Sequence, residues 1–127
     1  MADPKIKILH VEDDKSVQLI VKMVLEKAGY QVFSALDAMQ GLMMVRQVQP
    51  QLVILDIMMP AGGGHGLLER IRALNTTFTL PVLIYSAAEP AGLAEKISQD
   101  SLTAILPKPS PPTALLEAVK TLLAASS

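Results

Sequence analysis

Short apolar runs alternate with longer stretches of helical spacing, and this alternation limits the fold more than any other feature of the chain. The apolar runs are rich in Ile, Val and Leu and occupy residues 6–11, 31–33, 52–55, 81–85 and 102–106. Strands that alternate with helices predict a mainly parallel sheet with helices on both faces. The runs at 52–55 and 81–85 contain no alternating polar residues, as expected for strands that helices cover on both sides. We therefore predict a doubly wound α/β fold.

The stretches between the apolar runs carry the spacing and the end signals of helices. The clearest is 15–28, where one helical face carries Val17, Ile20, Val21, Val24, Leu25 and Ala28. Asp14 precedes it as a candidate N-cap, and Gly29 follows it as a stop signal. Further helices are predicted at 37–47, 66–74 and 91–99, and a last one from Pro112. The strand–helix pair recurs five times, which predicts one domain over residues 1–127.

Composition and charge exclude several classes of function. Eleven basic and twelve acidic residues give a formal net charge of −1, so direct nucleic-acid binding is not expected. The absence of cysteine excludes disulfides, thiolate metal sites and a cysteine nucleophile. The N-terminus lacks the apolar core of a signal peptide, and no apolar run approaches the roughly 20 residues that span a bilayer. We expect a cytoplasmic protein without a membrane partner.

Chemically active side chains stand at the carboxyl ends of the predicted strands, the edge at which open α/β sheets bind ligands. They are Glu12, Asp13 and Asp14 after the first strand, Asp56 after the third, Ser86 after the fourth and Lys108 after the fifth. Some of them have a plainer interpretation when taken alone. Asp14 fits an N-cap better than a ligand, and Glu12 and Asp13 could be solvated loop acids.

Asp56 is the hardest of these residues to explain as ordinary surface. It follows the apolar run 52–55 and precedes another apolar stretch, and a carboxylate in such surroundings requires a partner or a cation. Carboxylates that lie close together repel, so a divalent cation would neutralise them, and hard oxygen ligands suit Mg²⁺. A carboxylate can also attack phosphorus to give an acyl phosphate. The cation, the Lys108 ammonium and the Ser86 hydroxyl would then hold the oxygens of the transferred phosphoryl group.

A glycine-rich stretch at 62–66 follows the third strand and invites comparison with phosphate-binding loops. It does not complete G-x-G-x-x-G, because Leu67 and Leu68 fall where a third glycine is needed. No Lys-Ser or Lys-Thr follows it either. We interpret it as a flexible loop beside the acidic residues, with the next helix beginning near Gly66.

Several short fragments, in their order and spacing, resemble the receiver domains of two-component response regulators. They are Ile8-Leu9-His10-Val11-Glu12-Asp13-Asp14, Asp56-Ile57-Met58-Met59-Pro60 with Gly64 four residues later, Ser86-Ala87 and Lys108-Pro109. The resemblance covers about residues 5–123. It implies the flavodoxin-like receiver fold, in which five parallel strands have the order 2-1-3-4-5.

The resemblance also implies a role for the residues at this edge. Asp56 would accept a phosphoryl group from a phosphohistidine on a sensor histidine kinase or a histidine phosphotransfer domain. Mg²⁺ would bind to Glu12, Asp13, Asp56 and the backbone carbonyl of Met58. Ser86 and Lys108 would hold phosphoryl oxygens, and the Lys108–Pro109 peptide is expected to be cis. Such a domain is no enzyme beyond its own phosphorylation and dephosphorylation, and it acts by binding a downstream effector protein.

Three positions depart from the usual pattern of the family. Glu12 stands where aspartate is more common, and Ser110 stands where a bulky residue often follows Lys-Pro. Ile105 replaces the Tyr or Phe that moves inward when such domains are phosphorylated. Strand alternation places Tyr85 on the opposite face, so we do not assign it that role. Ile105 therefore weakens the part of the resemblance that concerns readout through the fourth helix, fifth strand and fifth helix. The resemblance also implies a possible dimer through these three elements.

Three interpretations of function stay open at this point. The first is a phosphorylation-dependent switch, either without an output domain, since only residues 124–127 follow the last predicted helix, or as one domain of a longer protein. The second is a pseudo-receiver that binds partners constitutively, which Ile105 suggests. The third is a flavodoxin-like cofactor carrier or an aspartate-based phosphatase. The acids after the first strand disfavour the carrier, and Met58, two residues after Asp56, disfavours the phosphatase.

Overall fold

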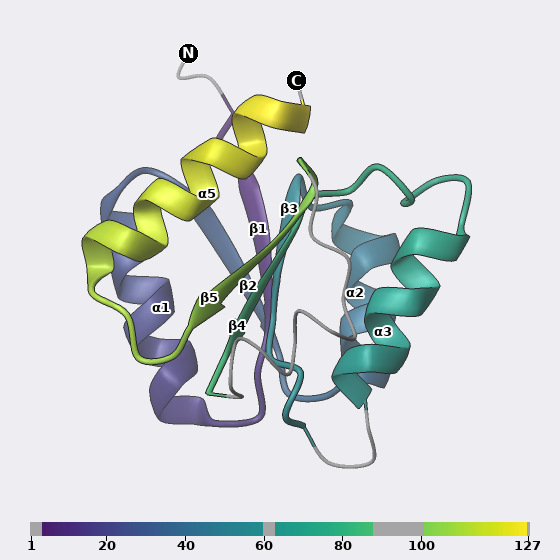
Figure 1. Cartoon of the computed structure of the whole chain (residues 1–127), viewed down its shortest axis with the longest axis horizontal. Helices are drawn as coiled ribbons and strands as arrows, with labels where there is room; N and C mark the ends of the chain where they lie inside the picture. Colours follow the sequence, from purple (N-terminus) through teal and green to yellow (C-terminus); the bar gives the residue numbers. More distant parts are fainter. Residues whose placement is uncertain (1–3, 60–62, 88–100, 127) are drawn as a thin grey trace.

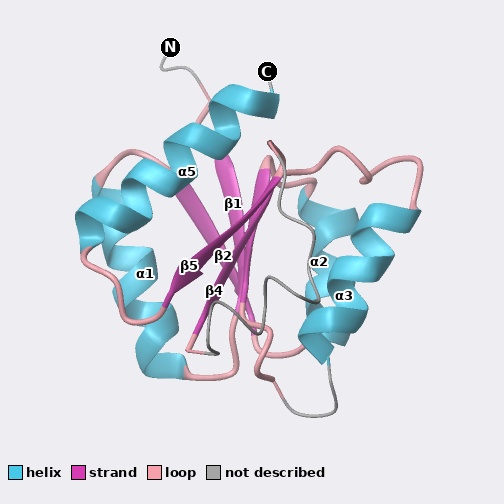
Figure 2. Cartoon of the chain, in the orientation of Figure 1, coloured by secondary structure: helices cyan, strands magenta, loops and turns pink. Residues whose placement is uncertain are grey.

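A five-stranded sheet forms the centre of the molecule, and its strands are parallel (Figure 1 and Figure 2). The computed structural model describes residues 4–59, 63–87 and 101–126. The strands are β1 (Lys7–Val11), β2 (Gln31–Ala35), β3 (Leu52–Leu55), β4 (Val82–Ser86) and β5 (Thr103–Pro107). Their order across the sheet is β2-β1-β3-β4-β5, which confirms the predicted topology and the doubly wound α/β class.

Helices cover both faces of this sheet, as Figure 1 shows. One face carries α1 (Lys15–Lys27) and α5 (Pro112–Ser126), and the other carries α2 (Ala38–Val48) and α3 (Gly63–Ala73). The helix predicted at 91–99 lies outside the described residues. Within the described ranges, no helix combines the length and the apolar character needed to cross a bilayer.

Local capping residues fix both ends of α1 and the start of α2, and those of α1 are the ones that the sequence indicated. The Asp14 carboxylate caps α1, as predicted, because it accepts hydrogen bonds from the backbone N–H groups of Ser16 (2.8 Å) and Val17 (3.3 Å). After α1, Gly29 adopts a φ of 100°, a left-handed conformation that glycine reaches without strain, and the helix stops. Asp37 caps α2, because its carboxylate accepts a hydrogen bond from the backbone N–H of Gln40 (2.8 Å).

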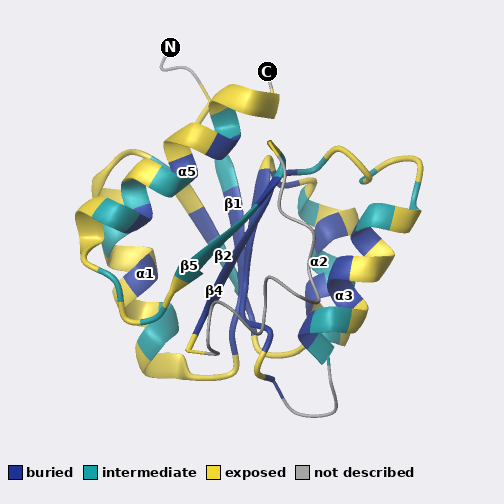
Figure 3. Cartoon of the chain, in the orientation of Figure 1, coloured by how far each residue is buried: buried dark blue, intermediate teal, exposed yellow. Residues whose placement is uncertain are grey.

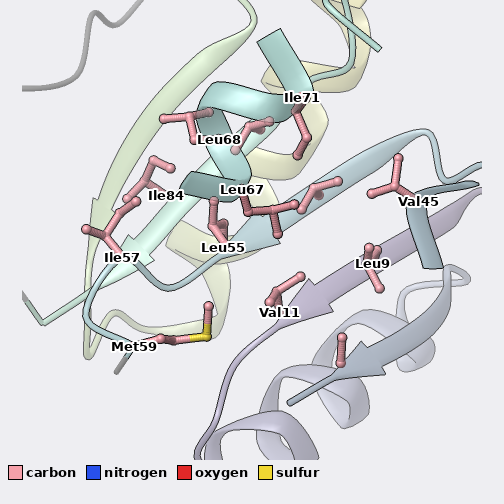
Figure 4. Close-up of a cluster of buried hydrophobic side chains, with 13 residues drawn as sticks. Leu9, Val11, Val45, Leu55, Ile57, Met59, Leu67, Leu68, Ile71 and Ile84 are labelled. Atoms are coloured by element: carbon pink, nitrogen blue, oxygen red, sulfur yellow. The ribbon is translucent and has the colours of Figure 1, made fainter. Parts of the chain in front are cut away.

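Two apolar clusters fill the space between the sheet and its helices. Figure 4 shows the cluster on the α2–α3 side, in which residues of the strands pack against α3; it includes Leu9, Leu55, Leu67, Ile71 and Ile84. The cluster on the α1–α5 side includes Ile8, Leu25, Leu83, Tyr85 and Val119. β3 and β4 are buried along their whole length, as their uninterrupted apolar sequences predicted (Figure 3).

The helix after β3 begins earlier than predicted. α3 starts at Gly63 instead of Gly66, so the interpretation of this stretch as a flexible loop was wrong over its described part. Packing overrides propensity here, because glycine disfavours helices but has no Cβ. A Cβ built on Gly64 would lie 2.6 Å from the Cα of Ile57 and still closer to the carbonyl oxygen of Asp56. The glycine therefore lets the first turn of α3 rest against the chain that follows β3.

Candidate functional site

Two carboxylates meet at the carboxyl edge of the sheet. Glu12 follows β1 and Asp56 follows β3, and these strands are neighbours. Backbone hydrogen bonds hold both residues, since the Glu12 N–H donates to the carbonyl of Ala35 (2.9 Å) and the Asp56 N–H donates to the carbonyl of Val11 (3.1 Å). Only 1% of Glu12 and 5% of Asp56 is exposed. Two acids removed from water in this way require compensating partners.

Asp56 accepts hydrogen bonds from three different parts of the chain. Its Oδ1 accepts from the backbone N–H of Met58 (3.0 Å) and from the hydroxyl of Ser86 at the end of β4 (2.9 Å). Its Oδ2 lies 3.4 Å from Nζ of Lys108, which follows β5. The structure thus brings together the acid, the hydroxyl and the ammonium that the strand ends predicted.

Lys108 links the two buried acids. Its Nζ lies 2.5 Å from Oε1 of Glu12 and 3.4 Å from Oδ2 of Asp56. Its backbone N–H donates to the carbonyl of Ser86 (2.9 Å), which ties the chain after β5 to the end of β4. The Lys108–Pro109 peptide is cis, as predicted. The ammonium is therefore held among carboxylates at a defined place at the edge of the sheet.

The same edge could hold a metal ion. Carboxylate oxygens of Glu12, Asp13 and Asp56 lie within 4.8 Å of one another, and Asp13 is exposed. Hard oxygen donors with access to solvent suit Mg²⁺, which keeps several waters and needs few protein ligands. The donor set fits this cation, and a contribution from the carbonyl of Met58 stays a prediction. Asp14 instead caps α1, as its interpretation as an N-cap predicted.

Burial and pairing act in opposite directions on the charges of this site. Burial raises the pKa of Glu12 to about 7, although the hydrogen bond from Lys108 opposes this rise. Burial also acts to raise the pKa of Asp56, but the hydrogen bonds from Met58 and Ser86, the charge of Lys108 and a hydrogen bond with Glu12 together hold that pKa below its usual value. For Lys108, burial acts to lower the pKa, and its pairing with the two carboxylates raises the pKa above its usual value. Asp56 is thus kept ionised, and a cation would relieve the negative charge on Glu12.

Two residues contribute to the site in ways that the sequence analysis missed. The side-chain amide of Gln18, on α1, donates to the carbonyls of Glu12 (2.7 Å) and Ala35 (3.0 Å) and so holds the ends of β1 and β2 together. Tyr85 lies on the face opposite to Ile105, as predicted. Its ring nevertheless contacts the site, because the ring centroid lies 5.9 Å from Nζ of Lys108. Alternation indicates the face of a strand residue but not its contact with a side chain from another segment.

Comparison with known proteins places the chain in a family. The family model described as the response regulator receiver domain matches residues 8–120. The chain belongs to this family. Among curated relatives of this receiver domain, the DNA-binding dual master transcriptional regulator RpaA of Synechocystis sp. is 37% identical over 81 residues, which cover 64% of this chain and 34% of that protein. The chain spans about a third of the length of the first curated relatives that it matches.

Solved structures of other receiver domains share the fold. The chemotaxis response regulator CheY4 of Vibrio cholerae is 26% identical and has a TM-score of 0.82, covering 94% of this chain and 99% of that one. The receiver domain of the hybrid histidine kinase CckA is 30% identical and has a TM-score of 0.74, covering 92% of this chain and 98% of that one. The acidic pocket of this receiver domain is consistent with a phosphoacceptor site of two-component signalling.

Proposed function

We propose that this receiver domain is a phosphorylation-controlled switch in which Asp56 accepts the phosphoryl group. The observation that carries the proposal is the set of groups around Asp56: the Ser86 hydroxyl at 2.9 Å, the Lys108 ammonium at 3.4 Å and the neighbouring acids. Phosphoryl transfer depends mainly on positioning and on neutralising charge, and these groups serve both needs. The lowered pKa of Asp56 keeps its carboxylate ionised and able to act as a nucleophile.

The phosphoryl donor would be a phosphohistidine of a sensor histidine kinase or of a histidine phosphotransfer domain. A carboxylate oxygen of Asp56 attacks phosphorus while the bond from phosphorus to the imidazole nitrogen breaks. The electron pair of that bond stays on the nitrogen. A phosphohistidine that is protonated on its other ring nitrogen therefore becomes a neutral histidine. The product is an acyl phosphate on Asp56. Later attack by water on phosphorus releases inorganic phosphate and restores the carboxylate.

The residues around Asp56 divide the work of this transfer. The Ser86 hydroxyl and the Lys108 ammonium bind oxygens of the incoming phosphoryl group and hold it in line with the carboxylate. Glu12, Asp13 and Asp56, with the carbonyl of Met58, would hold Mg²⁺. The bound cation would supply positive charge close to the transferred oxygens.

The test is mass spectrometry after incubation with Mg²⁺ and acetyl phosphate. We expect a gain of roughly 80 Da, one phosphoryl group, in the wild-type chain. The gain should disappear in Asp56→Asn. It should persist in Asp37→Asn, a matched change at an exposed acid where asparagine caps the helix as well as aspartate does. A wild-type chain that gains no mass at millimolar donor would refute the proposal.

The proposal includes an effector protein that recognises the phosphorylated domain. A second candidate is a pseudo-receiver that binds its partner constitutively. Ile105 supports this candidate, because it packs against the α2–α3 cluster and has no ring or hydroxyl that could respond to a change at Ser86. Equal affinity for a partner with and without phosphorylation would favour this candidate. A dimer through the fourth helix, β5 and α5 stays a prediction, as does a cytoplasmic location.

A further inference from the structure

The ring of Tyr85 lies against the ammonium of Lys108, with 5.9 Å between the ring centroid and Nζ. At this distance a cation is attracted to the electron-rich face of an aromatic ring, and the attraction grows when the pair is removed from water. Tyr85 is only 7% exposed, so the contact is largely desolvated. Lys108 therefore has an aromatic neighbour in addition to its two carboxylates.

The hydroxyl of Tyr85 connects this ring to the chain between β5 and α5. It accepts a hydrogen bond from the backbone N–H of Ser110 at 3.4 Å. The Ser110 hydroxyl in turn donates to the carbonyl of Pro107. The turn that carries both Lys108 and Ser110 thus meets Tyr85 at two points, the face of its ring and its hydroxyl.

Tyr85 and Ile105 lie on opposite faces of the sheet. Tyr85 belongs to the apolar cluster beneath α1 and α5, whereas Ile105 packs against the cluster beneath α2 and α3. An aliphatic side chain offers no ring face to a cation and no hydroxyl to a backbone donor. Among the residues that the structure describes, Tyr85 has both features and contacts the site through Lys108.

Phosphorylation of Asp56 would offer Lys108 a new partner. In the unphosphorylated structure its Nζ lies 2.5 Å from Glu12 and 3.4 Å from Asp56. A phosphoryl group on Asp56 adds strong acceptor oxygens and negative charge, which would attract the ammonium away from Glu12. Attraction to a ring face is less directional than a hydrogen bond, so Tyr85 can keep contact with the ammonium during this exchange.

We propose that Tyr85 is a positioning residue for Lys108, and that it passes the phosphorylation of Asp56 on to the turn that precedes α5. This inference rests on the proposed function, because it requires a phosphoryl group on Asp56. Its consequence is that the signal leaves the site on the α1–α5 face, through Ser110, and not through Ile105.

The chain carries its own optical probe, because it has two tyrosines and no tryptophan. The variant Tyr30→Phe leaves Tyr85 as the only tyrosine, and Tyr30 lies just before β2, away from the site. Tyrosine emission is measured while Mg²⁺ and beryllofluoride, a mimic of a phosphoryl group on a carboxylate, are added. We expect a saturable change in emission that disappears when Asp56→Asn is added to the variant. Unchanged emission, in a sample in which fluorine NMR shows the mimic bound, would overturn the inference.

A kinetic comparison separates positioning from packing. Tyr85→Phe keeps the ring and Tyr85→Leu removes it. We expect acetyl phosphate to phosphorylate the Phe variant within about twofold of the wild-type rate and the Leu variant roughly three- to thirtyfold more slowly, the range for a desolvated cation–ring contact. In a Lys108→Met background the change to Leu should have no further effect on the rate, since no ammonium remains to be positioned.

The hydroxyl is tested by NMR at Ser110. Its amide resonance should shift when beryllofluoride binds to the wild-type chain, and it should shift less in Tyr85→Phe, which lacks the acceptor. Equal shifts in both chains would overturn the role of the hydroxyl. The tyrosine emission and the Ser110 shift test the inference even if Tyr85→Leu does not fold. A wild-type chain that acetyl phosphate does not phosphorylate would instead refute the proposed function, so the two failures are distinguishable.

Discussion

Two glycines at the start of α3 test how the fold positions Asp56. Gly64 and Gly66 lie in the same helix, two residues apart. A Cβ on Gly64 would lie 2.6 Å from the Cα of Ile57 and 3.0 Å from its carbonyl oxygen, whereas a Cβ on Gly66 would have nothing within 4 Å. Gly66→Ala is therefore a matched control, in which the same methyl group is added without an overlap.

The two substitutions should change the free energy of unfolding in opposite directions. Alanine stabilises a helix relative to glycine by about 1 kcal/mol, and both variants gain this. At Gly64 the overlap is with backbone, which cannot turn aside as a flexible side chain can, so we expect the upper end of overpacking costs, about 3 kcal/mol. The expected net changes are a loss of about 2 kcal/mol for Gly64→Ala and a gain of about 1 kcal/mol for Gly66→Ala.

Guanidinium chloride unfolding, followed by circular dichroism, measures both changes as shifts of the midpoint at constant slope. Phosphorylation by acetyl phosphate gives a second measurement. Relief of the overlap at Gly64 displaces the backbone that carries Asp56, and a displacement of about 1 Å can slow a positioned reaction by about a hundredfold. Gly66→Ala should react at the wild-type rate. If Gly64→Ala proved as stable and as reactive as Gly66→Ala, α3 would not approach Asp56 as closely as the structure has it, and the reasoning would be refuted.

Three further predictions concern the hydrogen bonds of Arg72, the buried His10 and the metal. Arg72 donates from its guanidinium to the carbonyl of Leu80 (2.5 Å) and the hydroxyl of Thr103 (2.6 Å). Arg72→Ala should therefore lower the free energy of unfolding by roughly 2–4 kcal/mol. Arg72→Lys should restore less than about half of this loss, because an ammonium cannot span both acceptors. Equal denaturation midpoints for the two variants would contradict this prediction. His10 is buried, its Nδ1 has no hydrogen-bond partner among the described residues, and burial lowers its pKa from 6.5 to about 4. As the pH falls, the unfolded chain binds a proton here before the folded chain does, so this residue removes about 2 kcal/mol of stability between about pH 7.5 and 5. Unfolding curves at both pH values should show that His10→Leu loses less stability than the wild type by this amount, and identical losses would rule the effect out. Chelation of divalent cations before acetyl phosphate is added should abolish the mass gain at Asp56, and added Mg²⁺ should restore it; a gain that persists without metal would argue against the carboxylate cluster as a metal site.

The composition of the site could be predicted because parallel strands end at one edge of a sheet. Glu12, Asp56, Ser86 and Lys108 lie far apart in the chain, but each follows or ends an apolar run that reads as a strand. Once the alternation of strands and helices indicates a parallel sheet, these residues must lie near one another. The capping role of Asp14 could also be predicted, since a cap depends on neighbours within one turn.

The sequence by itself therefore determined the class of fold, the order of its elements and the set of groups that gather at the carboxyl edge, because periodicity and end signals act over short distances. Only the tertiary structure decided which groups touch. It extends α3 back to Gly63, because the missing Cβ of Gly64 permits a close approach that helix propensity does not predict. It also brings the Lys108 ammonium to 2.5 Å from Glu12 and 5.9 Å from the Tyr85 ring. Such distances depend on how segments that are remote in the chain pack together, and no local pattern carries that information.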